Sequence, residues 1–213
     1  MASILYLDTA SAHTQVAIAN EMGPVMELIH SIPNEQAKVL HHLIEDIFEK
    51  TKYNWEKIDA IAVDAGPGSY TGLRVGLGAA KGFCFALNKP LMLFNRLDLM
   101  LSSEESACVV LRARQGEGFL TVRKEGATLF PPQHVFYEHF NWNEVSGLPL
   151  YTDEELLLAQ VAGAQKIESY VLNINHWNHS AQQQYLRGEF ADIAYCEPFY
   201  LKEAFTTSAK KKI

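Results

Sequence analysis

The segment from Asp64 to Phe83 has the residue types and spacing with the most chemical content in this chain. It reads DAGPGSYTGLRVGLGAAKGF, so a turn rich in glycine and proline leads into a helical stretch. The free amides and the dipole of a helix N-terminus can bind an anion. The segment lacks the Gly-Lys-Ser/Thr of a Walker loop and the G-x-S-x-G frame of a hydrolase nucleophile. A turn that simply caps the helix stays open as the alternative to a ligand role.

The spacing of the histidines does not indicate a metal-binding site. His41 and His42 are adjacent, so on a helix their imidazoles point apart and cannot chelate one ion. His176 and His179 are three residues apart and could meet on one helix face, but no carboxylate accompanies them. We interpret both as surface histidines and expect no metal site in this chain.

The helical stretch contains four glycines, Gly72, Gly76, Gly78 and Gly82. Each interior glycine destabilises a helix by up to about 1 kcal/mol relative to alanine, so another interaction must offset the sum. Helical spacing places Gly72, Gly76 and Ala79 on one face, and Gly78 and Gly82 on another. One face could pack on the chain's own sheet while the other accepts a helix of a second chain, or both could serve the internal core.

The N-terminal half alternates between extended and helical patterns. Short apolar runs predict strands at 3–8, 16–20, 24–31, 58–65 and 91–94. Apolar residues at helical spacing predict helices at 34–50 and 69–87, followed by a short one after 95. Asn34, Ser69 and Asn95 are the predicted N-caps. The order β-β-β-α-β-α favours an α/β fold with a partly parallel sheet covered by helices.

A second, weaker round of elements begins at Ser106. Strands are predicted at 107–113, 119–123, 127–130 and 170–174, and helices at 153–162 and 180–187. The similar order hints at a duplicated lobe. We therefore divide the chain into an N-terminal lobe, 1–103, and a C-terminal lobe, 104–213.

Composition limits the classes of function. The chain has 213 residues and a formal net charge of −7. A protein that grips nucleic acid by itself usually carries a basic patch, and the only basic run is Lys210-Lys211-Lys212, which we interpret as a solvated tail. Three separated cysteines, no run long enough to span a bilayer and no basic segment before the apolar start predict a cytoplasmic protein without membrane segment or signal peptide.

Five segments resemble, in order, the motifs of the TsaB family, also called YeaZ. Residues 64–83 are similar to its G-P-G-S-F-T-G-x-R-x-G signature. The other similar segments are 4–10 (ILYLDTA), 35–40 (EQAKVL), 112–117 (RARQGE) and 197–202 (EPFYLK). Arg112 stands where the family usually has Asp, and residues 130–170 match poorly, which predicts a shortened C-terminal lobe.

The resemblance implies an actin-like, sugar-kinase-like ATPase (ASKHA) fold with two lobes, each a mixed sheet flanked by helices. It also implies a non-catalytic scaffold subunit that binds a paralogue, TsaD. That paralogue holds the metal and transfers a threonylcarbamoyl group to the tRNA adenosine next to the anticodon. TsaE, an ATPase, joins them, so ATP or ADP and metal are expected on the partner subunits and no cofactor on the isolated chain. The tRNA is expected to be reached indirectly, through the complex.

Asp8 is the remaining candidate for chemistry. In active members of the fold superfamily, the carboxylate that ends the first strand works near a metal-bound phosphate. Here we expect Asp8 and Thr9 to satisfy backbone amides in their turn. Together with Ser69, Tyr70 and Thr71, they are the candidate contacts for an anion or nucleotide at a subunit junction.

The two long helices of the N-terminal lobe are the predicted partner surface. They are expected to pack against matching helices of the TsaD-like partner, or to form a homodimer when the chain is alone. Arg74 could reach a partner carboxylate or a phosphate there. On this hypothesis, Gly76→Leu blocks the complex while the chain stays folded. The predicted interface residues are Val39, Leu43, Gly72, Leu73, Arg74, Gly76, Leu77, Ala79, Ala80 and Phe83.

Two other interpretations stay open. A self-sufficient enzyme of the same superfamily, ATP-binding or metallopeptidase-like, needs its own nucleotide or metal site. A generic homodimeric interaction protein has no role in tRNA modification.

Overall fold

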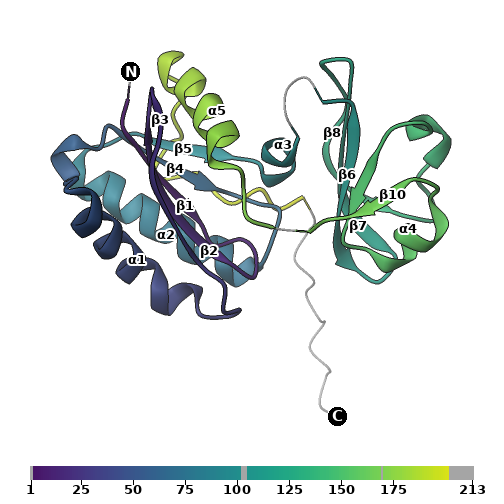
Figure 1. The fold of residues 1–213 in the computed structure, drawn as a ribbon, viewed down its shortest axis with the longest axis horizontal. Helices are drawn as coiled ribbons and strands as arrows, with labels where there is room; N and C mark the ends of the chain where they lie inside the picture. Colours follow the sequence, from purple (N-terminus) through teal and green to yellow (C-terminus); the bar gives the residue numbers. More distant parts are fainter. Residues whose placement is uncertain (1, 102–104, 169, 202–213) are drawn as a thin grey trace, which may run out of the picture.

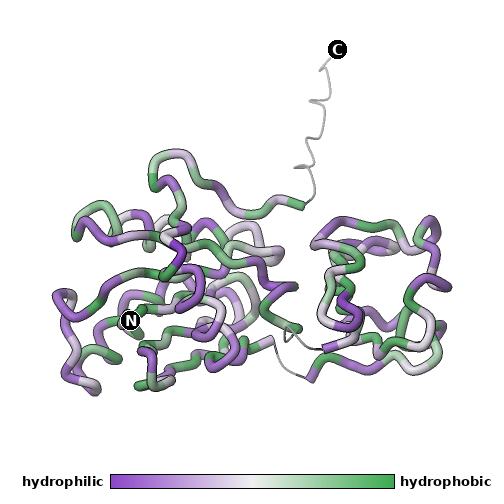
Figure 2. Tube along the Cα trace, turned by 90° about the horizontal axis from the view of Figure 1, so that it is seen from above, coloured by the Kyte–Doolittle hydropathy of each residue, from purple (hydrophilic) through white to green (hydrophobic). Residues whose placement is uncertain are grey.

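The computed structural model describes residues 2–101, 105–168 and 170–201. It contains two mixed β-sheets in two lobes that lie side by side (Figures 1 and 2). The first sheet consists of β1 (Ile4–Asp8), β2 (Thr14–Asn20), β3 (Gly23–His30), β4 (Ala60–Asp64) and β5 (Leu91–Phe94). Its helices are α1 (Gln36–Thr51), η1 (Trp55–Lys57), α2 (Tyr70–Leu87), α3 (Arg96–Met100) and α5 (Ile174–Leu186). The predicted two-lobe α/β architecture is confirmed.

The first sheet has the strand order β3-β2-β1-β4-β5, with β1, β4 and β5 parallel to one another. Leu7 pairs with Val63, and Asp64 with Phe94. The carboxyl ends of these three strands therefore meet at one edge of the sheet, which brings Asp8, Asp64 and the start of α3 together.

Helices cover both faces of this sheet. Leu5 and Leu7 of β1 point to the face covered by α1 and α2, while Ile4 and Tyr6 point to the face covered by α5 (Figure 1). All four side chains are fully buried. A strand buried on both faces explains why this part of the sequence is almost continuously apolar.

The second sheet repeats the topology of the first in reduced form. It consists of β6 (Ala107–Arg114), β7 (Glu117–Lys124), β8 (Ala127–Phe136), β9 (Leu150–Thr152) and β10 (Ala164–Lys166). Read as β8-β7-β6-β9-β10, its order matches β3-β2-β1-β4-β5. The helical segments of this lobe are η2 (Trp142–Val145) and α4 (Glu155–Gln160), where the first lobe has α1 and α2. The repeated strand order confirms the predicted duplication, whereas shortening relative to the family stays a prediction. The sequence patterns missed β9 and β10.

The predicted strand at 170–174 is wrong, and the last helix begins six residues earlier than predicted. The side chain of Asn173 accepts hydrogen bonds from the amides of Asn175 and His176, so α5 starts at Ile174. This helix returns to the first sheet: the Tyr6 hydroxyl donates to Asn178 Oδ1 at 2.6 Å. Residues assigned above to the C-terminal lobe therefore complete the N-terminal one.

The expected boundary near residue 103 lies outside the described residues, as do Lys202 and Lys210–Lys212. Of the predicted caps, Ser69 and Asn95 are confirmed, since their side chains accept from the amides of Gly72 and Leu97. The Asn34 cap is wrong, because α1 is preceded by Glu35, which makes no capping bond. None of the described helices is long and apolar enough to cross a membrane.

The glycines of α2 fall into two groups with different surroundings. A Cβ on Gly72 would collide with the Thr9 carbonyl oxygen, and a Cβ on Gly76 with Thr9 Oγ1. These two glycines therefore let the β1–β2 loop approach the helix backbone. A Cβ on Gly78 or Gly82 would meet nothing within 4 Å. The expectation for Gly76→Leu is thus overturned, because this glycine belongs to the internal core.

We predict that Gly76→Leu lowers the free energy of unfolding by at least about 2 kcal/mol, since the added side chain overpacks the contact with Thr9. Gly78→Leu, the matched control on the same helix, should leave stability unchanged or raise it by up to about 1 kcal/mol through helix propensity. Denaturant unfolding of the two variants measures the difference. Equal stabilities would contradict this account of the glycines.

Candidate functional site

A buried cluster of charge lies where β1, β4 and β5 end. Arg96, the first residue of α3, donates from Nη2 to Asp8 Oδ2 at 2.5 Å and from Nε to Asp64 Oδ2 at 2.7 Å. Each of the three residues is at most 1% exposed. The guanidinium is the cation that lies between these two buried carboxylates.

The remaining carboxylate oxygens bind the backbone. Asp8 Oδ1 accepts from the amide of Ala10 and Asp64 Oδ1 from that of Gly66, both at 2.8 Å. The expected role of Asp8 in its turn is therefore confirmed. Thr9 differs from expectation, because its hydroxyl donates to the Gly72 carbonyl oxygen at 2.7 Å.

One guanidinium faces two buried carboxylates in this cluster. Burial raises the pKa of Asp64 to about 7, with a further contribution from Asp8 and opposition from Arg96. Burial alone would lower the pKa of Arg96, but Asp64 and Asp8 raise it above its ordinary value. The cluster thus keeps its cation at all ordinary pH values while Asp64 titrates near neutrality.

Hydrogen bonds connect this cluster to the second lobe. Arg96 Nη1 donates to the Tyr170 carbonyl oxygen at 2.8 Å, and the Tyr170 hydroxyl donates to Asp153 Oδ2 at 2.7 Å. Asp153 Oδ1 in turn accepts from the amide of Arg112 at 2.6 Å. The chain has Arg112 where the resembling family has a carboxylate, and Asp153 places a carboxylate beside that backbone position.

The start of α2 is exposed, unlike the charged cluster. Ser69, Tyr70 and Thr71 all reach solvent, whereas Asp8 and Thr9 are fully buried. Only three of the five candidate junction contacts can therefore be reached from outside.

Arg74 lies one turn into α2 and is held by two exposed tyrosines. Its guanidinium stacks 4.3 Å from the ring centre of Tyr70. Its Nε also donates to the Tyr200 hydroxyl at 3.3 Å. Arg74 therefore presents a positive charge on an ordered aromatic support.

Burial within this chain excludes some side chains from the predicted partner interface. Five of its residues lie in the interior of this chain and cannot present side chains to another one: Gly72, Leu73, Gly76, Leu77 and Ala80. The other five are exposed or half-buried and stay a prediction: Val39, Leu43, Arg74, Ala79 and Phe83.

The solvent side of α2 is small and apolar. Its exposed positions include Arg74, Gly78, Gly82, Phe85 and Ala86, which we call the α2 outer face. Phe85 is 82% exposed. With bare backbone at Gly78 and Gly82, this face allows the close approach of another helix.

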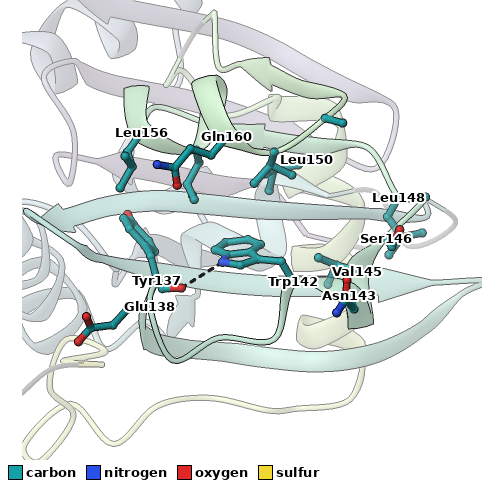
Figure 3. A pocket seen from close by; sticks show the side chains of 14 residues that line it. Tyr137, Glu138, Trp142, Asn143, Val145, Ser146, Leu148, Leu150, Leu156 and Gln160 are labelled. Atoms are coloured by element: carbon teal, nitrogen blue, oxygen red, sulfur yellow. Dashed lines mark hydrogen bonds between the residues drawn. The ribbon is translucent and has the colours of Figure 1, made fainter.

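The second lobe contains an apolar hollow of about 460 Å³ beside β9 and α4 (Figure 3). Tyr137 and Trp142 form one wall, and Trp142 Nε1 donates to the Tyr137 carbonyl oxygen at 3.1 Å. Glu138 is the only charged side chain in its lining. The described residues contain no group of three or more His, Cys, Asp and Glu side chains placed to hold a metal ion.

Arg96 and Asp153 were not among the residues predicted to form a site. Arg96 follows a parallel strand, next to a predicted cap, and this position is a signal because the ends of parallel strands converge. Asp64 was part of the quoted signature but had no predicted role, because the convergence of the strand ends was not considered there either. Asp153 carried no comparable signal, since strand β9 was not predicted.

We predict that Asp64 makes wild-type stability fall as pH rises. In the folded chain this carboxyl keeps its proton to about pH 7, whereas its ordinary pKa of 3.8 applies after unfolding. The folded state therefore binds more protons between these values, and the free energy of unfolding decreases from pH 5 to pH 8. Asp64→Asn removes that slope. If the free energy of unfolding changes equally with pH in wild type and variant, the assignment is contradicted.

Comparison with known families covers most of the chain. Residues 32–195 match the family described as "TsaD: tRNA N6-adenosine threonylcarbamoyltransferase". The tRNA threonylcarbamoyladenosine biosynthesis protein TsaB of Haemophilus influenzae is 26% identical over 163 residues, which are 73% of this chain and 66% of that protein. The Escherichia coli protein of the same name is 33% identical over 42% of this chain and 38% of its own length.

A transferase is also among the relatives. The tRNA N6-adenosine threonylcarbamoyltransferase of Dictyoglomus turgidum is 41% identical over 40% of this chain and 25% of its own length. The chain thus spans less than two thirds of the length of these curated relatives.

Solved structures show the same fold. A Pseudomonas aeruginosa protein described as similar to peptidase YEAZ has a TM-score of 0.79 at 21% identity, over 95% of this chain and 100% of that one. YeaZ from Pseudomonas aeruginosa has a TM-score of 0.74 at 20% identity, over 94% and 100%. The predicted fold of two lobes, each a mixed sheet flanked by helices, is confirmed, as is the resemblance to TsaB (YeaZ). The chain belongs to the family of the matching TsaD model.

Proposed function

We propose that this chain is a non-catalytic subunit in the biosynthesis of threonylcarbamoyladenosine in tRNA, and that it acts by binding a TsaD-like catalytic paralogue. The names of its TsaB relatives support the pathway. The observation that carries the subunit role is the α2 outer face, which the chain's own packing leaves open.

The glycine content of α2 supports a partner at that face. Contacts with Thr9 account for Gly72 and Gly76, so their cost in helix stability is offset within the chain. A Cβ added to Gly78 or Gly82 would meet nothing within 4 Å, so no contact in this chain requires glycine there, although each costs about 1 kcal/mol relative to alanine. A helix of another polypeptide that packs against bare backbone would offset this cost, with Phe85 as an apolar anchor.

The charged cluster supports the non-catalytic part of the proposal. A metal-bound phosphate at the strand ends needs free carboxylates, but Asp8 and Asp64 are both bonded to Arg96 and to backbone amides. Removing a buried ion pair to admit a ligand is expected to cost about 3–5 kcal/mol. ATP or ADP and metal are therefore assigned to the partners, and TsaE-like ATPase and tRNA are expected to join through the complex.

The alternative is that this chain transfers the group itself, since the matching family is described by the transferase activity. The two functions differ in what the isolated chain does. The proposed subunit gives no product alone and supports product formation when the paralogue is present.

We predict that depletion of this chain abolishes threonylcarbamoyladenosine in the organism's tRNA, measured by mass spectrometry of nucleosides. Re-expression of wild type should restore it. With purified components, product should require both this chain and the paralogue. Product from this chain alone would favour the transferase, and unchanged modification after depletion would reject the pathway.

We further predict that Gly78→Leu and Phe85→Asp each prevent co-purification with the paralogue while the isolated chain stays folded. The leucine blocks close helix approach, and the aspartate places an unpaired charge in an apolar contact. Leu186→Asp, at an exposed apolar position on the opposite side of the sheet, is the matched control. Normal co-purification of both α2 variants would contradict the proposed interface. If the isolated wild type forms a homodimer through this face, the same variants should be monomeric.

A further inference from the structure

A cavity of about 370 Å³ lies between the two lobes, bounded by the end of β5, α3, β7 and α5. We call it the interlobe cavity. Its apolar lining includes Phe94, Leu99 and Phe199, and its polar lining includes Arg123, His176 and His179. Asp8, Asp64 and Arg96 do not line it, so it is separate from the charged cluster.

Hydrogen-bond donors in this cavity have unused capacity. Arg123 lies 3.5 Å from Asp98 and donates from Nη1 to the Leu101 carbonyl oxygen at 3.2 Å. Within the part of the chain that the structure describes, neither the imidazole of His176 nor that of His179 hydrogen-bonds a protein group. Two imidazoles and a guanidinium from different lobes therefore line one space.

Electrostatics at this place favour an added anion. Burial lowers the pKa of His176, and Arg123 of β7 and His179 of α5 lower it further. Glu105, which precedes β6, acts in the opposite direction. Asp98 of α3, the other charged residue of the lining, is already paired with Arg123. An anion would relieve the repulsion among the three groups and satisfy their free donors.

We propose that the interlobe cavity binds a small organic anion, a carboxylate or phosphate monoester that carries an apolar group. Arg123, His176 and His179 hold the anionic end, and Phe94, Leu99 and Phe199 contact the apolar part. The cavity volume is in the range of small-molecule sites, about 300–1,000 Å³.

The position of the cavity gives the ligand a structural consequence. Arg123 belongs to the second lobe, whereas β5 is a strand of the first sheet and α5 packs on that sheet. A bound anion therefore bridges the lobes and stabilises their relative arrangement.

The test uses the full chain and three probes: phenyl phosphate, benzoate and inorganic phosphate. Titration calorimetry at pH 6 should give saturable binding at one site for at least one of the two aromatic probes, and weaker binding for inorganic phosphate. Arg123→Met and His179→Gln should each weaken binding by at least roughly tenfold. Arg187→Met is the matched control, since Arg187 is an exposed arginine at the end of α5 paired with Glu189.

The dependence on pH provides a second readout. Because the anion favours protonated imidazole, affinity should fall from pH 6 to pH 8, and the NMR titration of His176 should move to higher pH when the probe is bound. The preference between phenyl phosphate and benzoate identifies the anion class. His179 is exposed, so His179→Gln tests the site even if Arg123→Met unfolds. No saturable binding up to about 10 mM, or binding unchanged in His179→Gln, would overturn the proposal.

Discussion

A buried guanidinium connects the strand ends of the first sheet to the second lobe. Arg96 neutralises the carboxylates that end β1 and β4, and it also donates to the Tyr170 carbonyl oxygen. Tyr170 continues the connection through Asp153 to the backbone of β6. Because breaking a buried ion pair by losing one partner is strongly destabilising, the strand ends and the interlobe connection are expected to hold together as one unit. The same bonds occupy oxygens of both carboxylates at this edge of the sheet.

A second constraint is the backbone contact between the β1–β2 loop and α2. The Ser69 amide donates to the Ala10 carbonyl oxygen at 2.7 Å, and the Thr9 hydroxyl donates to that of Gly72. Such contacts are possible only without side chains at Gly68, which faces Ala10, and at Gly72 and Gly76, which face Thr9. One segment, Asp8–Ala10, therefore bonds α2 on one side and Arg96 on the other. The helix that presents the proposed partner surface is fixed to the charged cluster through three consecutive residues.

Local sequence predicted the first lobe well because its strands are buried on both faces and its helices have strong apolar periodicity. Ser69 and Asn95 were correct caps because their short polar side chains lie next to the free amides of the first turn. Non-local packing explains the failures. The apolar residues near Leu172 looked like a strand, but Gln15 takes both backbone groups of Leu172, and α5 begins directly afterwards. Helical spacing grouped Gly72 and Gly76 on one face, but the prediction that Gly76 contacts a partner is wrong, because Thr9 of this chain covers it.

The return of α5 to the first sheet separates the two proposed binding surfaces. Helices α1 and α2 cover one face of the sheet, and α5 covers the other (Figure 1). A partner on the α2 outer face and an anion in the interlobe cavity therefore do not compete for the same residues. Both are connected to the strand ends, since α3 contributes Arg96 to the charged cluster and Asp98 and Leu99 to the cavity. Helix α3 is one connection between the two surfaces, because its five residues contact the cluster, the cavity and the second lobe. A second connection runs along the chain from Phe199, which lines the cavity, to Tyr200, whose hydroxyl accepts from Arg74 of the α2 outer face.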